Sequence, residues 1–187
     1  TYFASEAVAG RIPLRKWNSA ADQWICRVEC LRTFFPELEI PPFDDEARLT
    51  VLEMVALETK TVKAFRNAEI LPTLHDWFNP EYRPLLAEMT PEHYTIPGRK
   101  KPSAIDYQDP GAPRLSIRIQ DAMRLKNHPK IAADRCPLTI ELLAPNQRPV
   151  QVTQDLNAFW STSYPSIRKD LRGRYPKHDW PESFRFA

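Results

Sequence analysis

The sequence predicts an α+β fold, in which a small helical bundle precedes an antiparallel sheet of about five strands and a C-terminal tail that is helical and then extended. Apolar residues recur at three- and four-residue spacing in the first half of the chain and alternate with polar residues in the second half. With 187 residues, the chain is long enough for one domain or for two small subdomains. We expect a lead-in over 1–13, a helical part over 14–89 and a sheet part over 90–187, packed together as one unit.

The first predicted helix begins after Asn18 or Ser19, because either side chain can cap a helix, and it ends at Pro36. Its apolar face consists of Trp24, Ile25, Val28, Leu31 and Phe35. A second helix is predicted after Asp44, which can act as its cap. The apolar side of that helix consists of Leu49, Leu52, Val55 and Ala56. Two shorter helices, interrupted by prolines, are predicted in "AEILPTLHDWF" and "PEYRPLLAEM".

The strands are predicted from an alternation with a period of two. In "RLSIRI", apolar Leu115, Ile117 and Ile119 alternate with polar residues, and "LTIEL", "PVQVT" and "HYTIP" show the same alternation. This pattern is typical of an antiparallel sheet with one solvent-exposed face. Turn-forming residues in "QDPGAP" and "APNQ" predict two hairpins, one joining "AIDY" to "RLSIRI" and one joining "LTIELL" to "RPVQVT".

The composition is that of an ordinary globular protein, with 42% apolar and 27% charged residues. No apolar run approaches the roughly 18 residues that a membrane span needs. We therefore expect a soluble, cytoplasmic protein. The N-terminus lacks a signal-peptide pattern and starts with Thr1 instead of Met, so the chain is interpreted as an excised fragment.

The reactive residues indicate no catalytic or metal site. Three cysteines do not make a disulfide framework, which favours a reducing compartment, and Cys26, Cys30 and Cys136 are interpreted as small buried apolar residues. Glycine loops that bind phosphate, the nucleophile-elbow motif and the zinc-binding helix motif do not occur in the sequence. The histidines lie far apart: His75, His93, His128 and His178. We expect no metal, no cofactor and no independent enzymatic activity in this chain.

Charge is distributed unevenly along the chain. Seven acidic residues lie between Glu37 and Glu58, where Arg48 is the one basic residue. Near the C-terminus a basic stretch carries five cations: Arg168, Lys169, Arg172, Arg174 and Lys177. The two regions predict two surfaces of opposite charge, although a charge run is most often a solvated helix face.

The basic stretch has two interpretations. A helix starting near Pro165 and stopped by Gly173 would place Ile167 and Leu171 inward and Arg168, Lys169 and Arg172 outward, where they could neutralise phosphates. Composition alone favours a solvated face without a ligand. The nearby aromatic residues are assigned to structure: Tyr175 and Trp180 are expected to pack toward Phe159, Trp160 and the sheet.

The segments "RPVQVT-DL-FW" and "YP-IRK-LRGRYPKH-W" closely resemble the C-terminal region of HrpB-type ATP-dependent helicases, bacterial members of the DEAH group. Weaker similarity extends the resemblance over nearly all of residues 14–182. The chain departs from the family pattern at Met123-Arg124 and at Asp134-Arg135-Cys136, in segments expected to form turns.

The resemblance implies an accessory C-terminal domain that is itself non-catalytic. The helicase motor domains, with their ATP and Mg²⁺, would lie upstream in the same parent chain, and the basic stretch would assist the motor in binding RNA or DNA. The alternative is a docking module that binds the motor or another protein through the acidic helix or the sheet edge, and so regulates the motor without touching nucleic acid.

Overall fold

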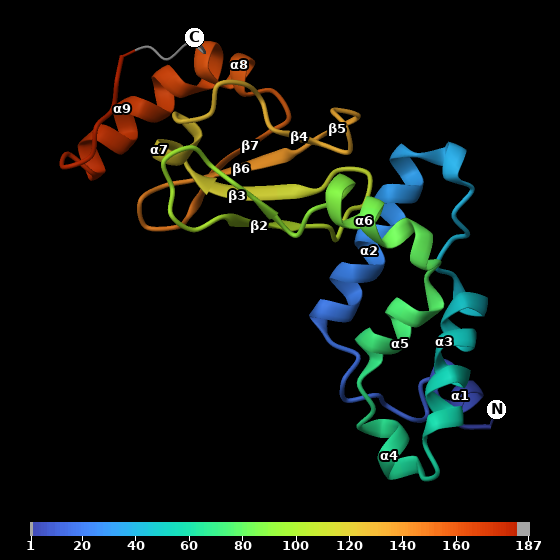
Figure 1. The fold of residues 1–187 in the computed structure, drawn as a ribbon. Helices are drawn as coiled ribbons and strands as arrows, with labels where there is room; N and C mark the ends of the chain where they lie inside the picture. The colour runs from blue at the N-terminus through green and yellow to red at the C-terminus, as the bar shows by residue number, and fades with distance from the viewer. Residues whose placement is uncertain (1, 183–187) are drawn as a thin grey trace. The chain divides into compact units, whose positions relative to one another are not determined.

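A computed structural model describes residues 2–182 and divides the chain into two compact units, with the boundary between Thr90 and Pro91 (Figure 1). The first unit is helical. Its elements are α1 (Tyr2–Val8), α2 (Ser19–Phe34), η1 (Pro36–Leu38), α3 (Asp45–Glu58), α4 (Val62–Arg66), α5 (Ile70–Trp77), η2 (Pro80–Tyr82) and α6 (Arg83–Met89). No helix among the described residues is both long enough and apolar enough to cross a membrane.

The two longest helices of this unit begin at the predicted caps. The Asn18 side chain accepts hydrogen bonds from the backbone N–H groups of Ala20 and Ala21 at 3.1 and 3.2 Å. Asp44 does the same for Glu46 and Ala47, both at 3.0 Å. Each side chain satisfies backbone donors that have no partner within the helix, which is why the caps could be predicted locally.

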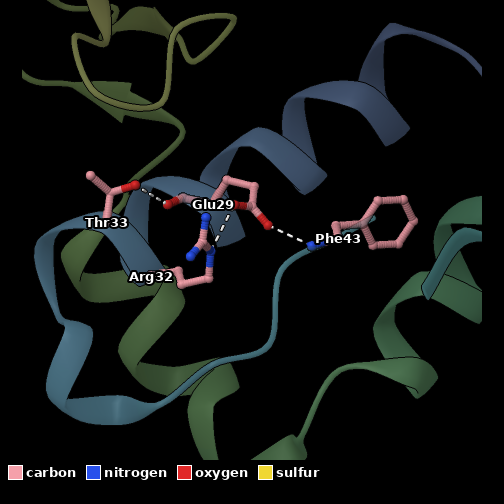
Figure 2. A network of polar contacts seen from close by, with 4 residues as sticks. All are labelled: Glu29, Arg32, Thr33 and Phe43. Carbon is pink, nitrogen blue, oxygen red and sulfur yellow. Dashed lines mark hydrogen bonds and ion pairs between the residues drawn. The ribbon is translucent and has the colours of Figure 1, made fainter. Parts of the chain in front are cut away.

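The segment between α2 and α3 is held by Glu29, as Figure 2 shows. The Glu29 carboxylate accepts from the backbone N–H of Phe43 at 2.7 Å and from Nε of Arg32 at 2.8 Å. The Phe43 ring in turn meets Trp77 edge to face, with centroids 5.2 Å apart. The Glu29 carboxylate therefore fixes the position of the segment that leads to the α3 cap.

The buried core of the helical unit forms between its helices and includes these apolar residues: Val28, Leu31, Leu52, Val55, Phe65, Ile70 and Leu74.

The second unit is built on a sheet. Within the described residues, five strands pair in the order β1 (His93–Tyr94), β2 (Ser103–Asp106), β3 (Arg114–Arg118), β6 (Thr139–Leu143) and β7 (Pro149–Thr153). Both predicted hairpins are confirmed, because β2 pairs antiparallel with β3 and β6 pairs antiparallel with β7.

The sheet is antiparallel except between β3 and β6, which run parallel. A parallel pair needs a crossover connection, and here residues 119–138 provide it. The crossover contains α7 (Ile119–Ala122) and a small hairpin of β4 (Lys130–Ile131) and β5 (Cys136–Pro137). Ile119, predicted as the end of a strand, instead begins α7, which packs against β3 and β6.

The alternation predicted for β3 is confirmed. Leu115 and Ile117 are buried and pair with Ile140 and Leu142 of β6, so four apolar side chains share the core face. The intervening residues Ser116 and Arg118 are exposed on the other face of the sheet. This leaves a polar sheet face that the core does not use.

After β7 the chain forms one continuous helical segment made of α8 (Leu156–Ala158), the π-helical turn η3 (Phe159–Ser163) and α9 (Tyr164–Arg174). Leu156, Phe159 and Trp160 are buried, as the sequence predicted. The prediction that Gly173 stops the helix is wrong. Gly173 lies inside α9, and the helix ends at Arg174, where the backbone N–H of Tyr175 still bonds to the Leu171 carbonyl at 2.7 Å.

Candidate nucleic-acid interface

The C-terminal tail, residues 175–182, folds back along α9 and is held there by hydrogen bonds from two α9 side chains. Arg168 Nε donates to the Trp180 carbonyl at 2.7 Å, and the Tyr164 hydroxyl donates to the Pro181 carbonyl at 3.0 Å. Within the tail, the Trp180 indole N–H donates to the Tyr175 carbonyl at 2.9 Å. The tail is therefore an ordered part of the unit, as a chain end becomes when its backbone groups are tied down.

Trp180 is 5% exposed, so its ring is buried, as the assignment to structure requires. Its ring forms part of an edge-to-face series with His178 and Tyr175, with centroids 6.3 Å apart at each step. Phe159, Trp160 and Tyr164 make a second aromatic group, in which the Trp160 and Tyr164 centroids are 5.1 Å apart. Tyr164 connects the second aromatic group to the tail, since its ring packs on Trp160 while its hydroxyl donates a hydrogen bond to the tail.

The predicted outward orientation of Arg168 is wrong. Its side chain is only 15% exposed, because the guanidinium lies against the tail and also contacts the Glu182 carboxylate at 3.4 Å. Helical spacing places Arg168 next to the inward side of α9, and the returning tail covers that position. Arg168 therefore stabilises the tail.

The other four predicted cations, Lys169, Arg172, Arg174 and Lys177, are exposed, and we call them the basic face. Lys169 and Arg172 are three residues apart, a spacing that brings side chains together on a helix. Arg174 forms an ion pair with Asp170 at 3.2 Å, but both side chains are well exposed, so solvent screens this pair strongly. Four cations against Asp170 leave a formal charge of 4 − 1 = +3 for these five residues.

Among residues 2–182, no three His, Cys, Asp or Glu side chains gather closely enough to hold a metal ion. Cys30 and Cys136 are buried, as predicted, whereas Cys26, one turn before Cys30 on α2, is half-buried.

The family described as "ATP-dependent helicase C-terminal" (HrpB_C) matches residues 51–183, which is most of the chain. The chain belongs to this family. Among proteins related to this HrpB_C domain is the ATP-dependent RNA helicase HrpB of Escherichia coli (strain K12), with 35% identity over 170 residues. That alignment covers 89% of this chain and 21% of the relative, so the chain spans about a fifth of the relative's length.

Two solved structures share the fold of this HrpB_C domain. One is titled "Crystal structure of E. coli DExH-box NTPase HrpB", with a TM-score of 0.80 and 34% identity, covering 90% of this chain and 21% of that one. The other is titled "Crystal structure of Escherichia coli DEAH/RHA helicase HrpB", with a TM-score of 0.71 and 33% identity, covering 90% and 22%. The resemblance stated from the sequence is confirmed.

Sequence reasoning missed two features of this HrpB_C domain. It did not single out Tyr164, whose four-residue spacing to Arg168 places both residues on the side of α9 that holds the tail. Burial raises the pKa of the Tyr164 phenol, which keeps the hydroxyl protonated as a donor. It also passed over the basic run Arg99, Lys100 and Lys101, which was visible as three consecutive cations.

Proposed function

We propose that this domain assists an ATP-dependent helicase by binding the backbone of a single nucleic-acid strand on its basic face. The observation that carries the proposal is the set of exposed cations on α9 and on the tail bound to it: Lys169, Arg172 and Arg174 on the helix and Lys177 on the tail. Membership of the helicase C-terminal family supports a nucleic-acid ligand. The name of the E. coli relative supports RNA as the first strand to test.

Binding of this kind depends on salt, because cations that neutralise phosphates release condensed counterions from the strand. Each phosphate contact with a single strand contributes about 0.7 to the slope of log affinity against log salt. If all four cations of the basic face make contacts, the slope is about −2.8. ATP and Mg²⁺ are assigned by this proposal to motor domains of the parent helicase, since the chain has no phosphate-binding glycine loop.

The test compares two double variants that remove the same charge. In Lys169→Gln/Arg172→Gln, the basic face loses two cations while glutamine keeps good helix propensity. In the control Lys60→Gln/Lys63→Gln, two exposed lysines of the helical unit are changed in the same way. Fluorescence anisotropy with a labelled single-stranded RNA oligonucleotide, repeated from about 50 to about 200 mM salt, measures affinity and slope.

We expect the first variant to bind more weakly and its slope to flatten by about 1.4, while the control behaves like wild type. Equal binding by wild type and the Lys169→Gln/Arg172→Gln variant would refute the basic face as the contact. If the wild-type chain binds no oligonucleotide but binds the motor domains, the docking alternative replaces this proposal.

A further inference from the structure

A hollow of about 520 Å³ lies at one end of the polar sheet face, far along the sequence from the basic face. It forms where the ends of β3 and β6 meet the start of β2, the loop before β2 and α7. Its polar lining includes Arg99, Ser103, Ser116, Arg118 and Gln147. The volume is within the range of small-ligand sites, roughly 300–1,000 Å³.

Two exposed cations line this hollow, Arg99 and Arg118, and whereas Arg99 is paired with the Asp121 carboxylate, Arg118 is held by a neutral group. With the Gln147 amide oriented so that its oxygen faces Arg118, that oxygen accepts from Arg118 Nε at 2.7 Å and from Nη2. A neutral amide fixes the direction of a guanidinium without cancelling its charge, unlike a carboxylate. The remaining N–H donors of Arg118 keep the geometry that suits a phosphate or carboxylate oxygen.

Gln147 occupies a strained position. Its φ is +69°, in the left-handed region where glycine is the residue without steric cost. The turn is nonetheless closed, with the Gln147 N–H bonded to the Ala144 carbonyl at 2.9 Å. A side chain is thus present where glycine would be favoured, and what that side chain does in the structure is hold Arg118.

Asp121 is itself a lining residue of the hollow, and Glu141 bonds to the lining residue Ser116, but both carboxylates are already engaged by other side chains. Asp121 accepts from Arg99 Nη1 at 3.1 Å, and the same nitrogen contacts the Ser103 hydroxyl at 3.1 Å. Glu141 accepts from the Ser116 hydroxyl at 2.6 Å and lies 3.6 Å from Arg114. These carboxylates therefore repel an incoming anion less than unpaired carboxylates would.

The loop before β2 and the wall of the hollow complete the case for an anionic ligand with an apolar part. Lys100 and Lys101, between the lining residues Arg99 and Pro102 in sequence, are exposed and add positive charge to the loop before β2. Pro102 and Leu143 supply apolar surface to the lining. A phosphate attached to a ring or sugar matches this combination of one fixed guanidinium and an apolar wall.

We propose that this hollow is a second contact for the nucleic-acid strand, a subsite for one nucleotide whose phosphate binds Arg118. The inference rests on the proposed function, since it assumes that the domain binds a strand. The subsite adds a directed bond to a single nucleotide, whereas the basic face supplies general attraction to the backbone.

The experiment uses the 187-residue chain and the same labelled RNA oligonucleotide. Arg118→Gln removes the guanidinium, Gln147→Gly removes the side chain that holds it, and Lys130→Gln is the control, an exposed cation of the same unit on β4. Uridine monophosphate, inorganic phosphate and a polyglutamate peptide serve as competitors. Thermal melts of every variant show whether each remains folded.

We expect Arg118→Gln to weaken binding about tenfold and to flatten the salt slope by about 0.7. Gln147→Gly should weaken binding less, without melting below wild type, since glycine suits the backbone there. Lys130→Gln should bind like wild type, and the monophosphate should displace the oligonucleotide better than inorganic phosphate or the peptide.

Three results would overturn the inference. If Arg118→Gln binds like wild type while Lys169→Gln/Arg172→Gln binds weakly, the subsite is wrong and the proposed function stands. If wild type binds no oligonucleotide, both fail. If polyglutamate displaces the strand as well as the monophosphate does, the hollow is a carboxylate site and the nucleotide assignment is wrong.

Discussion

The contact between the tail and α9 predicts that Trp180→Ala destabilises the second unit by about 3 kcal/mol. The indole is almost fully buried and its N–H bonds to the Tyr175 carbonyl, so the change removes both apolar burial and a hydrogen bond. The Trp180 and Pro181 carbonyls also accept from Arg168 and Tyr164. Loss of the ring therefore weakens the whole attachment of the tail.

The magnitude follows from the buried surface. A tryptophan side chain buries about 200 Å², which at about 25 cal/mol per Å² is worth about 5 kcal/mol. Because the unfolded chain already buries part of this surface, the value falls to about 3–4.5 kcal/mol. The side-chain entropy recovered on unfolding offsets about 1 kcal/mol, and the lost indole hydrogen bond adds about 1 kcal/mol back.

A urea melt followed by far-UV circular dichroism measures the effect. With an m value of about 1.5–2 kcal/mol/M, a loss of 3 kcal/mol lowers the midpoint by about 1.5–2 M. The matched control is Arg172→Ala, an exposed position on the same helix where a change within about 0.5 kcal/mol is expected. If Trp180→Ala melts like wild type but no longer binds the oligonucleotide, the ring is a stacking platform for bases and the structural assignment is refuted.

Two further predictions concern Arg168 and His128. Arg168→Gln should lower the free energy of unfolding by about 1–3 kcal/mol, because it removes a charged donor to the Trp180 carbonyl. The salt slope of oligonucleotide binding should stay that of wild type. A flatter slope with unchanged stability would show that Arg168 contacts the strand and does not stabilise the tail. Burial lowers the pKa of His128 below its ordinary value of 6.5. The neutral ring accepts a hydrogen bond at Nδ1 from the Leu156 N–H at 3.4 Å, and its Nε2 lies 2.8 Å from the Leu138 carbonyl oxygen. The unfolded chain therefore binds a proton first as the pH falls below about 6.5, so the stability contributed by His128 is complete above that pH and decreases below it. Urea midpoints at about pH 7.5 and about pH 5.5 should differ less in His128→Gln than in wild type, and an equal difference would contradict this role.

The sequence by itself determined the features that depend on neighbouring residues. The caps at Asn18 and Asp44 are bonds to N–H groups two and three residues away, so the residue type and its position suffice to predict them. The alternation around Leu115 and Ile117 likewise determines which side of β3 is buried, because successive side chains of a strand point to opposite faces. The family resemblance, carried by short motifs near the C-terminus, was also contained in the sequence.

The tertiary structure decided whatever depends on residues far apart in the chain. The direction of β6 beside β3 was set by a crossover of about twenty residues, whose path no periodicity describes. Arg168 is covered because the tail returns over it, and Arg118 is fixed by Gln147 from the next hairpin. The physical reason is the same in each case: periodicity reports which side of an element is apolar, but a polar side chain takes its place from partners that only packing brings within hydrogen-bond distance.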